Sequence, residues 1–205
     1  MSVLIIDYGM GNLASVRRAF EECGASVFIS NNPLEIKDAE RLVLPGVGAF
    51  HDAMVLLSEK GWVNAIREAV LNEGIPVLGI CLGMQLLANS GVEGGETHGL
   101  ALVPGRVVRL EPKDVRERVP HVGWNEVHFA TTHQLFDGIA DGTDFYFVHS
   151  YHFIPDEPKY VLATTPYCES FVSVVANEKV FGTQFHPEKS SKVGFKLIQN
   201  FLRVK

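Results

Sequence analysis

Residues 75–88, with the sequence IPVLGICLGMQLLA, decide the fold that we expect for this chain. Residues 75–80 form a short apolar run, which is typical of a strand buried in a parallel sheet. Residues 82–88 follow at once and predict a helix. Cys81 stands at the junction between Gly79 and Gly83, where the turn is too tight for larger side chains. A nucleophile between a strand and a helix is the pattern of a nucleophile elbow, here with cysteine in place of serine.

The same alternation of strand and helix extends toward the N-terminus. Val3-Leu4-Ile5-Ile6 predicts a strand, and Asn12 is a suitable N-cap for a helix that Gly24 ends. Strands that alternate with helices predict a parallel sheet with right-handed crossovers. Further strands are expected at residues 25–29 and 41–44, and further helices at residues 49–58 and 62–72.

The pattern changes after about residue 91. Residues 92–99 predict a loop rich in Gly and Glu, and residues 190–203 predict a final helix. Between them we expect short strands at residues 105–110, 119–129, 145–153, 160–165, 171–176 and 179–185. No linker or repeat divides the chain, so we expect one domain over residues 1–205. Its fold class is α/β, a mostly parallel sheet with an antiparallel extension.

Composition excludes several classes of protein. The chain has 205 residues, of which 46% are hydrophobic, and a formal net charge of −6. This acidic balance argues against a nucleic-acid partner, because phosphate binding normally requires a basic excess. No apolar run approaches the ~20 residues that span a bilayer, so we expect no membrane association. Three cysteines without a signal peptide predict reduced thiols and a cytoplasmic location.

Cys81 is the strongest candidate nucleophile, because the elbow places its sulfur at a helix N-terminus, where the helix dipole favours negative charge. Cys23 lies on the apolar face of a predicted helix, and Cys168 lies in a predicted loop without flanking glycines, so both are expected to be structural or incidental. A thiolate needs a base and proton donor, and the segment His186-Pro187-Glu188 supplies an imidazole with a carboxylate two residues away. If the chain stays extended there, the two side chains point the same way. An exposed histidine before a helix cap remains the alternative.

The loop Pro45-Gly46-Val47-Gly48 leaves a predicted strand at the edge where ligands bind in open α/β sheets. Its backbone N–H groups, together with that of Leu82, would form an oxyanion hole beside the nucleophile. An ordinary glycine-rich turn is the alternative.

Two other patterns are weaker. Gly9-Met10-Gly11-Asn12-Leu13-Ala14 matches the dinucleotide fingerprint, but Ser30, Asn31 and Asn32 occupy the region where an acidic ribose anchor is expected. His149 and His152 lack cysteine or carboxylate partners at zinc spacing, so we predict no metal.

Together and in this order, the Pro45 loop, residues 79–85 (GICLGMQ) and His186-Pro187-Glu188 resemble the class I, triad-type glutamine amidotransferases. Residues 7–12 (DYGMGN), 121–125 (HVGWN) and 146–151 (YFVHSY) look like the branch formed by the glutaminase subunits of imidazole glycerol phosphate synthase. The resemblance implies a three-layer, flavodoxin-like fold and no cofactor. It implies a Cys81–His186–Glu188 triad, an oxyanion hole at Val47, Gly48 and Leu82, and glutamine contacts at Gly46, Gln85, Ser150 and Tyr151.

The resemblance also implies a partner. In this family a separate (β/α)₈ synthase subunit uses the ammonia, giving imidazole glycerol phosphate and an aminoimidazole carboxamide ribotide in histidine biosynthesis. By matching motif positions, the heterodimer interface would include Asp7, Asn12, Trp124, Asn125, Tyr146 and Lys189. The glutaminase is nearly idle until the synthase subunit binds its substrate. Gly46 and Gly48 would let the peptide between them rotate and present its N–H only in the active state.

Three other functions remain open at this stage. The chain could be the glutaminase of another amidotransferase branch, or a γ-glutamyl peptidase that needs no partner. It could be a non-catalytic nucleotide-binding subunit that uses Gly9 to Ala14, in which case Cys81→Ala has no effect. It could be a cysteine-based redox sensor, although that leaves His186 and Glu188 without a role.

Overall fold

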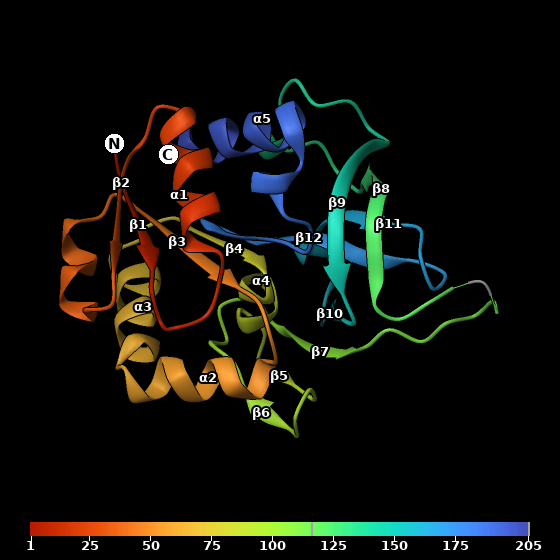
Figure 1. Ribbon diagram of the computed structural model, residues 1–205, viewed down its shortest axis with the longest axis horizontal. Coiled ribbons are helices and arrows are strands. Elements are labelled where there is room, and N and C mark those ends of the chain that lie inside the picture. The colour runs from red at the N-terminus through yellow and green to blue at the C-terminus, as the bar shows by residue number, and fades with distance from the viewer. Residues whose placement is uncertain (116, 205) are drawn as a thin grey trace.

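A parallel sheet forms the centre of the molecule (Figure 1). The computed structural model describes residues 1–115 and 117–204. Its parallel strands lie in the order β2-β1-β3-β4-β13, which is the flavodoxin-like order 2-1-3-4-5. Their bounds are β1 (Ser2–Ile6), β2 (Ser26–Ser30), β3 (Arg41–Gly46), β4 (Val77–Cys81) and β13 (Val180–Thr183).

Helices cover both faces of this sheet, so the expected three layers are confirmed. Side chains of a strand alternate between its two faces. Val3 and Ile5 therefore pack toward α1 (Leu13–Glu22) and α5 (Ser191–Leu202). Leu4 and Ile6 pack toward α2 (Phe50–Glu59) and α3 (Trp62–Leu71), which lie on the opposite face in Figure 1. No helix among the described residues is long and apolar enough to cross a membrane.

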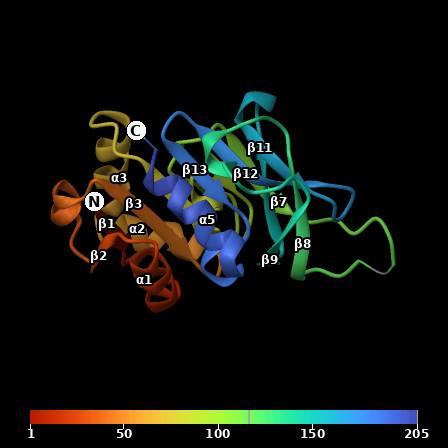
Figure 2. The ribbon, with the colours of Figure 1, turned by 90° about the horizontal axis from the view of Figure 1, so that it is seen from above.

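An antiparallel extension continues from β13, as Figure 2 shows from above. β12 pairs antiparallel with β13, and the sheet continues through antiparallel pairs to β10 and β7. Its end is β5, which pairs parallel with β7 and antiparallel with β6. β11 joins β12 to β8, which forms a hairpin with β9. The bounds are β5 (Ser90–Gly91), β6 (Thr97–His98), β7 (Gly105–Arg109), β8 (His121–Phe129), β9 (Thr143–His149), β10 (Tyr151–Pro155), β11 (Val161–Thr165) and β12 (Phe171–Asn177).

Short helical segments complete the chain. The helix after Cys81 is α4 (Leu82–Leu86), which is shorter than the helix expected at residues 82–88. In addition, the segment 92–99, expected to be a loop, contains the short strand β6, which pairs with β5. The 3-10 segments are η1 (Pro33–Asp38), η2 (Gln134–Phe136), η3 (Pro158–Tyr160) and η4 (Pro187–Lys189).

The single strand expected at residues 145–153 is wrong. The segment is two strands, β9 and β10, separated by Ser150. β9 pairs with β8 up to His149, whereas β10 pairs with β7 from Tyr151 onward. Apolar residues continue on both sides of Ser150, so the hydrophobic pattern conceals the point where the chain changes its hydrogen-bonding partners. Residues 149–151 at this corner line the same cavity as Cys81, the last residue of β4.

Candidate active site

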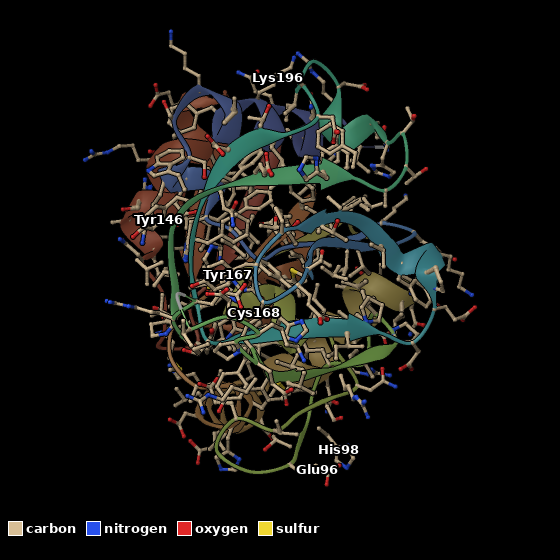
Figure 3. All side chains as sticks on the ribbon, turned by 90° about the vertical axis from the view of Figure 1, so that its right-hand side faces the viewer. Glu96, His98, Tyr146, Tyr167, Cys168 and Lys196 are labelled. Atoms are coloured by element: carbon tan, nitrogen blue, oxygen red, sulfur yellow. The ribbon has the colours of Figure 1, made fainter. Side chains whose placement is uncertain are left out.

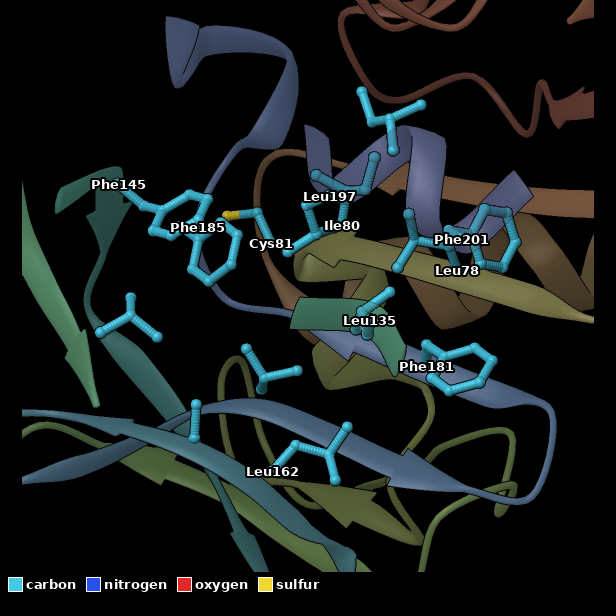
Figure 4. Close-up of a cluster of buried hydrophobic side chains, with 14 of the residues drawn as sticks. Leu78, Ile80, Cys81, Leu135, Phe145, Leu162, Phe181, Phe185, Leu197 and Phe201 are labelled. Atoms are coloured by element: carbon cyan, nitrogen blue, oxygen red, sulfur yellow. The ribbon is translucent and has the colours of Figure 1, made fainter. Parts of the chain in front are cut away.

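The chain makes a sharp turn at Cys81, between β4 and α4. The backbone of Cys81 has φ 56° and ψ −109°, a conformation that non-glycine residues rarely adopt. Both neighbouring glycines are required by close approach. A Cβ on Gly79 would lie 2.5 Å from the carbonyl oxygen of Gly83, and a Cβ on Gly83 would overlap the carbonyl oxygen of Leu44. The elbow geometry therefore matches the prediction, and Figure 4 shows Cys81 beside Phe185 at the edge of a buried cluster.

His186 reaches the same edge of the sheet because β13 lies parallel to β4. Gly182 pairs with Gly79, so the chain leaves β13 next to the elbow. The Nδ1 atom of His186 lies 2.8 Å from Oε1 of Glu188, and the two side chains are 4% and 2% exposed. The predicted contact is thus present. Its geometry differs from the extended chain that we expected, because residues 187–189 form the 3-10 turn η4.

Backbone contacts from two other elements hold His186 in place. Its N–H donates to the carbonyl oxygen of Tyr146 on β9, at 2.9 Å. The hydroxyl of Ser190 donates to the carbonyl oxygen of His186 at 2.6 Å and accepts the N–H of Tyr146 at 3.0 Å. The position of the imidazole therefore depends on β9 as well as on β13.

The imidazole of His186 is set up as a proton donor. Burial lowers the pKa of His186, but its interactions with Cys81 and Glu188 raise that pKa more, to about 9. At neutral pH the ring is therefore protonated. Among the described residues, the buried Nε2 atom has no hydrogen-bond partner, and the ring lines the cavity that contains Cys81. A cation with a free N–H beside a sulfur can deliver a proton to a leaving group.

A cavity of about 260 Å³ brings most of the predicted site together. Glu93 and Pro120 also line it, and the sequence analysis missed both. The lining residues are Val47, Gly48, Cys81, Gln85, Glu93, Pro120, Val148, His149, Ser150, Tyr151 and His186. Gly46, Leu82 and Glu188 are not among the residues that line this cavity. Gly46 and Leu82 are next in sequence to Val47 and Cys81, which do line it, and Glu188 contacts His186.

Glu93 supplies the carboxylate of the cavity. It accepts the N–H of Phe50 at 3.1 Å. Burial raises the pKa of Glu93, and this hydrogen bond opposes the increase. Its place in a stretch rich in Gly and Glu gave no sequence signal that separated it from a solvent-exposed glutamate.

Two glutamine side chains, Gln85 and Gln184, form a series of hydrogen bonds between the backbone of Tyr151 and the sulfur of Cys81. The Nε2 atom of Gln85 donates to the carbonyl oxygen of Tyr151 at 2.9 Å and to Oε1 of Gln184 at 3.0 Å. The Nε2 atom of Gln184 lies 3.8 Å from Sγ of Cys81. Gln184 was not predicted. The polar side next to the sulfur is therefore fixed by amide groups, which carry no net charge.

The loop after β3 runs beside the elbow, because Gly46 pairs with Cys81. A Cβ on Gly46 would lie 2.8 Å from the backbone nitrogen of Gly83, so this position needs glycine for space. Gly48 has φ +101°, a conformation that favours glycine, and Val47 is 44% exposed. Met10 packs against Gly48, so the Gly9–Ala14 turn contacts this loop.

The outer face of the β8–β9 hairpin carries exposed apolar side chains at two of its pairs, Val122–Val148 and Trp124–Tyr146, and the charged pair Glu126–Asp144 follows them. Trp124 is 54% exposed and pairs with Tyr146, their ring centroids 6.0 Å apart. The Nζ atom of Lys189 lies 5.9 Å from the centre of the Tyr146 ring. Val122 and Val148 extend this surface, and Figure 3 shows Tyr146 on this side of the molecule. Contiguous exposed apolar groups of this kind mark interaction sites.

The other residues expected at the interface have partners inside the chain. Asp7 accepts the N–H of Gly9 at 3.0 Å, and Asn12 caps α1 through the N–H of Ser15 at 3.3 Å. The amide of Asn125 contacts His121 and the carbonyl oxygen of Pro166.

Cys23 and Cys168 do not line the cavity that contains Cys81. Cys23 is half-buried against the carbonyl oxygen of Phe195, and Cys168 is buried. All three cysteines are free thiols. Within residues 1–115 and 117–204, no cluster of three or more His, Cys, Asp or Glu side chains is arranged to hold a metal ion.

A strained cysteine, a buried histidine–carboxylate pair and a glycine loop around one cavity are the parts of a triad-type amidohydrolase. Residues 4–204 match the family model described as "Glutamine amidotransferase class-I". The chain belongs to the class-I glutamine amidotransferase family.

Relatives with higher sequence identity make the comparison within this family more specific. The chain is 51% identical to imidazole glycerol phosphate synthase subunit HisH of Moorella thermoacetica, over 97% of this chain and 93% of that protein. It is 48% identical to HisH of Geobacillus sp., over 98% and 95%, and 45% identical to HisH 1 of Campylobacter jejuni, over 98% and 100%.

Solved structures with low sequence identity share the fold. A putative GMP synthase protein from Thermoplasma acidophilum superimposes with a TM-score of 0.75 at 20% identity, over 100% of this chain and 93% of that one. PurLQS from Thermotoga maritima gives a TM-score of 0.75 at 17% identity, over 98% and 97%.

Proposed function

We propose that this protein is the glutaminase subunit of an imidazole glycerol phosphate synthase. It hydrolyses glutamine to glutamate and ammonia and delivers the ammonia to a synthase subunit. The observation that carries this proposal is the convergence of Cys81, His186 and Glu93 on one cavity, with Glu188 hydrogen-bonded behind the imidazole. That cavity offers a nucleophile, a proton donor and an anionic group for a cationic substrate end.

The first half of the reaction breaks the amide bond. The Cys81 thiolate attacks the side-chain carbonyl carbon of glutamine, and the carbonyl oxygen becomes an oxyanion. The N–H of Leu82, the first residue of α4, and an N–H of the Val47–Gly48 segment stabilise that charge. Protonated His186 gives its proton to the departing nitrogen, and ammonia leaves. Glu188 holds Nδ1 of the ring and stabilises its charged form.

The second half releases glutamate. Neutral His186 removes a proton from water, and the resulting hydroxide attacks the γ-glutamyl thioester. A second oxyanion forms in the same position and collapses, and the thiolate of Cys81 leaves. His186 is then protonated again, so the triad returns to its starting state.

Glutamine is held by groups on three sides of the cavity. Glu93 binds its α-ammonium group, because a partly buried carboxylate forms strong charge-assisted hydrogen bonds with a cation. Gln85, Ser150 and Tyr151 hold the rest of the substrate, and Gly46 leaves room at the elbow.

A second subunit receives the ammonia. Ammonia released to water at neutral pH would be protonated and lost as a nucleophile, so a direct path between subunits is chemically reasonable. The exposed surface around Trp124, Tyr146 and Lys189 adjoins the cavity through Val148, whose carbonyl oxygen lies 3.7 Å from Sγ of Cys81. We assign this surface to a (β/α)₈ synthase subunit in a cytoplasmic heterodimer, with Asp7 and Asn12 at its margin.

Activity would be controlled at the Val47 peptide. Gly48 already uses a positive φ, and Val47 is substantially exposed, so rotation of the peptide between them meets little steric resistance. Comparing the orientation of this peptide with and without synthase ligand tests the proposal. A loop that already presents its N–H to the cavity in the idle enzyme would contradict it.

The deciding experiment uses the complex of this chain with a synthase subunit and its nucleotide ligand. Cys81→Ser should abolish glutamine-dependent synthesis and leave synthesis from added ammonium salt unchanged. Strong wild-type glutaminase activity without the partner would instead indicate an ungated hydrolase of the peptidase type. No activity in either setting would favour the nucleotide-binding subunit.

A further inference from the structure

Two buried histidines beside the cavity have no part in the triad chemistry. His121 lies on β8 and His149 on β9, and the two residues pair directly across the hairpin. They are 4% and 5% exposed. Nδ1 of His121 lies 3.1 Å from Nε2 of His149. Such a pair is costly to bury, so each ring must be hydrogen-bonded in a defined way.

The hydrogen bonds fix the tautomer of each ring. Nδ1 of His149 lies 2.8 Å from the carbonyl oxygen of Tyr151, which can only accept, so Nδ1 carries the hydrogen. Nε2 of a neutral His149 must then accept, and Nδ1 of His121 donates to it. Nε2 of His121 accepts in turn from the amide of Asn125, at 3.3 Å.

The orientation of the Asn125 amide confirms which nitrogen of His121 carries the hydrogen. Oδ1 of Asn125 accepts the N–H of Glu126 at 2.9 Å, so its Nδ2 is the group that faces His121. The hydrogen bonds therefore form one series in which each group donates to the next, from Asn125 through His121 and His149 to the carbonyl oxygen of Tyr151. The tautomer of each ring is fixed by the bonds on either side of it.

Both rings stay neutral and are held in place by packing. Burial lowers the pKa of His121 to about 4 and is the largest cause that lowers the pKa of His149 to about 3. The ring of His121 stacks on Tyr167, with centroids 4.0 Å apart, and His149 packs edge-on against Phe171. Figure 3 labels Tyr167 on the same side of the molecule as Tyr146. The two rings therefore have little freedom to rotate.

This series of hydrogen bonds ends at the carbonyl oxygen of Tyr151, where it meets a second series that leads to Cys81. The carbonyl oxygen of Tyr151 accepts from His149 and also from Gln85, which bonds to Gln184 next to Cys81. Residues 149–151 form the corner where β9 gives way to β10, and all three line the cavity. The backbone of this corner is held by sheet pairing at His149 and Tyr151 and by the N–H of Leu110, which donates to the carbonyl oxygen of Ser150 at 2.9 Å. The side-chain bonds to Tyr151 add the constraint on the side that faces the cavity.

We propose that His121 and His149 are positioning residues that hold the 149–151 corner in the geometry that binds glutamine. The proposal rests on the proposed function, since glutamine is the substrate considered. Loss of the His149–Tyr151 bond leaves Gln85 as the described side-chain donor to the carbonyl oxygen of Tyr151, so the cavity side of the corner loosens. Substrate binding then weakens while the triad keeps its arrangement. The expected signature is a higher KM for glutamine with little change in kcat.

The test uses substitutions that separate the two nitrogen atoms of His149. His149→Asn places an amide near the Nδ1 position and can still donate to Tyr151. His149→Gln places its amide near the Nε2 position and loses that bond. In the complex with a ligand-bound synthase subunit, we expect the Gln variant to raise KM for glutamine about tenfold, and the Asn variant by less than about threefold. Ammonium-dependent synthesis should stay unchanged in both.

Two further variants complete the design. His121→Phe keeps the stacking on Tyr167 and removes the donor to His149, and it should raise KM about threefold. His128→Asn, on the same strand but half-exposed beside Asp141, is the matched control and should behave as wild type.

The outcomes are distinguishable. A wild-type complex that releases no glutamate from glutamine would overturn the proposed function itself. Equal KM changes in His149→Asn and His149→Gln, or a fall in kcat at unchanged KM, would overturn the positioning role. If His149→Gln unfolds, His121→Phe decides, and an unchanged KM in that variant refutes the proposal. Calorimetric titration of glutamine into Cys81→Ser, with and without His149→Gln, should show the same weakening without turnover.

Discussion

Gly79→Ala is expected to damage catalysis more than folding. A Cβ at this position would lie 2.5 Å from the carbonyl oxygen of Gly83, 2.7 Å from its carbonyl carbon and 2.8 Å from the nitrogen of Met84. All three are backbone atoms of α4, which cannot swing aside as a side chain does. Ordinary contact between carbon and oxygen needs roughly 3.3 Å, so α4 must retreat by about 0.8 Å. The N–H of Leu82 moves with it.

The expected magnitudes follow from that displacement. Loss of one oxyanion donor lowers kcat by about 10²–10³-fold, and a misplacement near 1 Å can cost about 10²-fold. We therefore expect glutaminase kcat to fall by about 10–100-fold. Overpacking costs about 1–3 kcal/mol, which lowers Tm by about 2–12 °C in a chain of this size.

Gly182→Ala is the matched control, because Gly182 pairs with Gly79 across β4 and β13. Its added Cβ meets the side chain of Met84 at 2.6 Å, and methionine can adapt. We expect a similar loss of Tm and nearly normal kcat. Glutamate release by the complex, ammonium-dependent synthesis and thermal unfolding are the three measurements. If Gly79→Ala keeps kcat within about twofold of wild type, or Gly182→Ala loses as much, the reasoning about α4 is refuted.

Three other expectations can be tested in the same system. The pKa of His186 is raised from 6.5 to about 9, so its protonated ring stabilises the fold fully below pH 6.5, and this contribution is lost as pH rises through 9. Denaturant unfolding at pH 7 and pH 10 should show a decrease in stability that is smaller in His186→Asn, and an equal decrease contradicts this account. Glu93→Gln should raise KM for glutamine at least about tenfold in steady-state kinetics, whereas Glu96→Gln, exposed in the same loop, should not. Trp124→Ala should weaken synthase binding at least about tenfold by titration calorimetry, with the exposed Val115→Ala as control, and equal affinities would remove Trp124 from the interface.

The elbow and the parallel sheet could be predicted from the sequence because a strand-to-helix turn and the alternation of strands with helices are local signals. The flavodoxin-like strand order came only from the family resemblance, because the order of strands depends on contacts between distant segments. A tight strand-to-helix turn has no room for side chains on either side of its nucleophile, and glycines at positions 79 and 83 around Cys81 meet that requirement. In the structure, a Cβ at either glycine would clash with backbone atoms. The contact between His186 and Glu188 was predicted for a partly incorrect reason. Proline at 187 supports the extended conformation at His186, but the following turn brings Glu188 back to the ring.

The missed features depend on contacts between distant segments. Glu93 enters the cavity only because its loop folds back over the start of α2, where it accepts the N–H of Phe50. Gln184 is an ordinary polar residue in an expected strand until β13 is placed beside β4. The break at Ser150 is invisible because pairing partners are not encoded in the alternation of apolar residues.

The position of β13 has a consequence for how the enzyme is made. β13 lies between β4 and β12 in the sheet, yet it is the last strand along the chain that the structure describes. Roughly a hundred residues must be synthesised after Cys81 before His186 leaves the ribosome, which takes on the order of 5–20 s. During that interval Cys81 has been synthesised but His186 has not, and β4 lacks the strand that pairs with its second edge, β13. A nascent or truncated chain therefore cannot hydrolyse glutamine, so glutaminase activity appears only after the central gap in the sheet has closed.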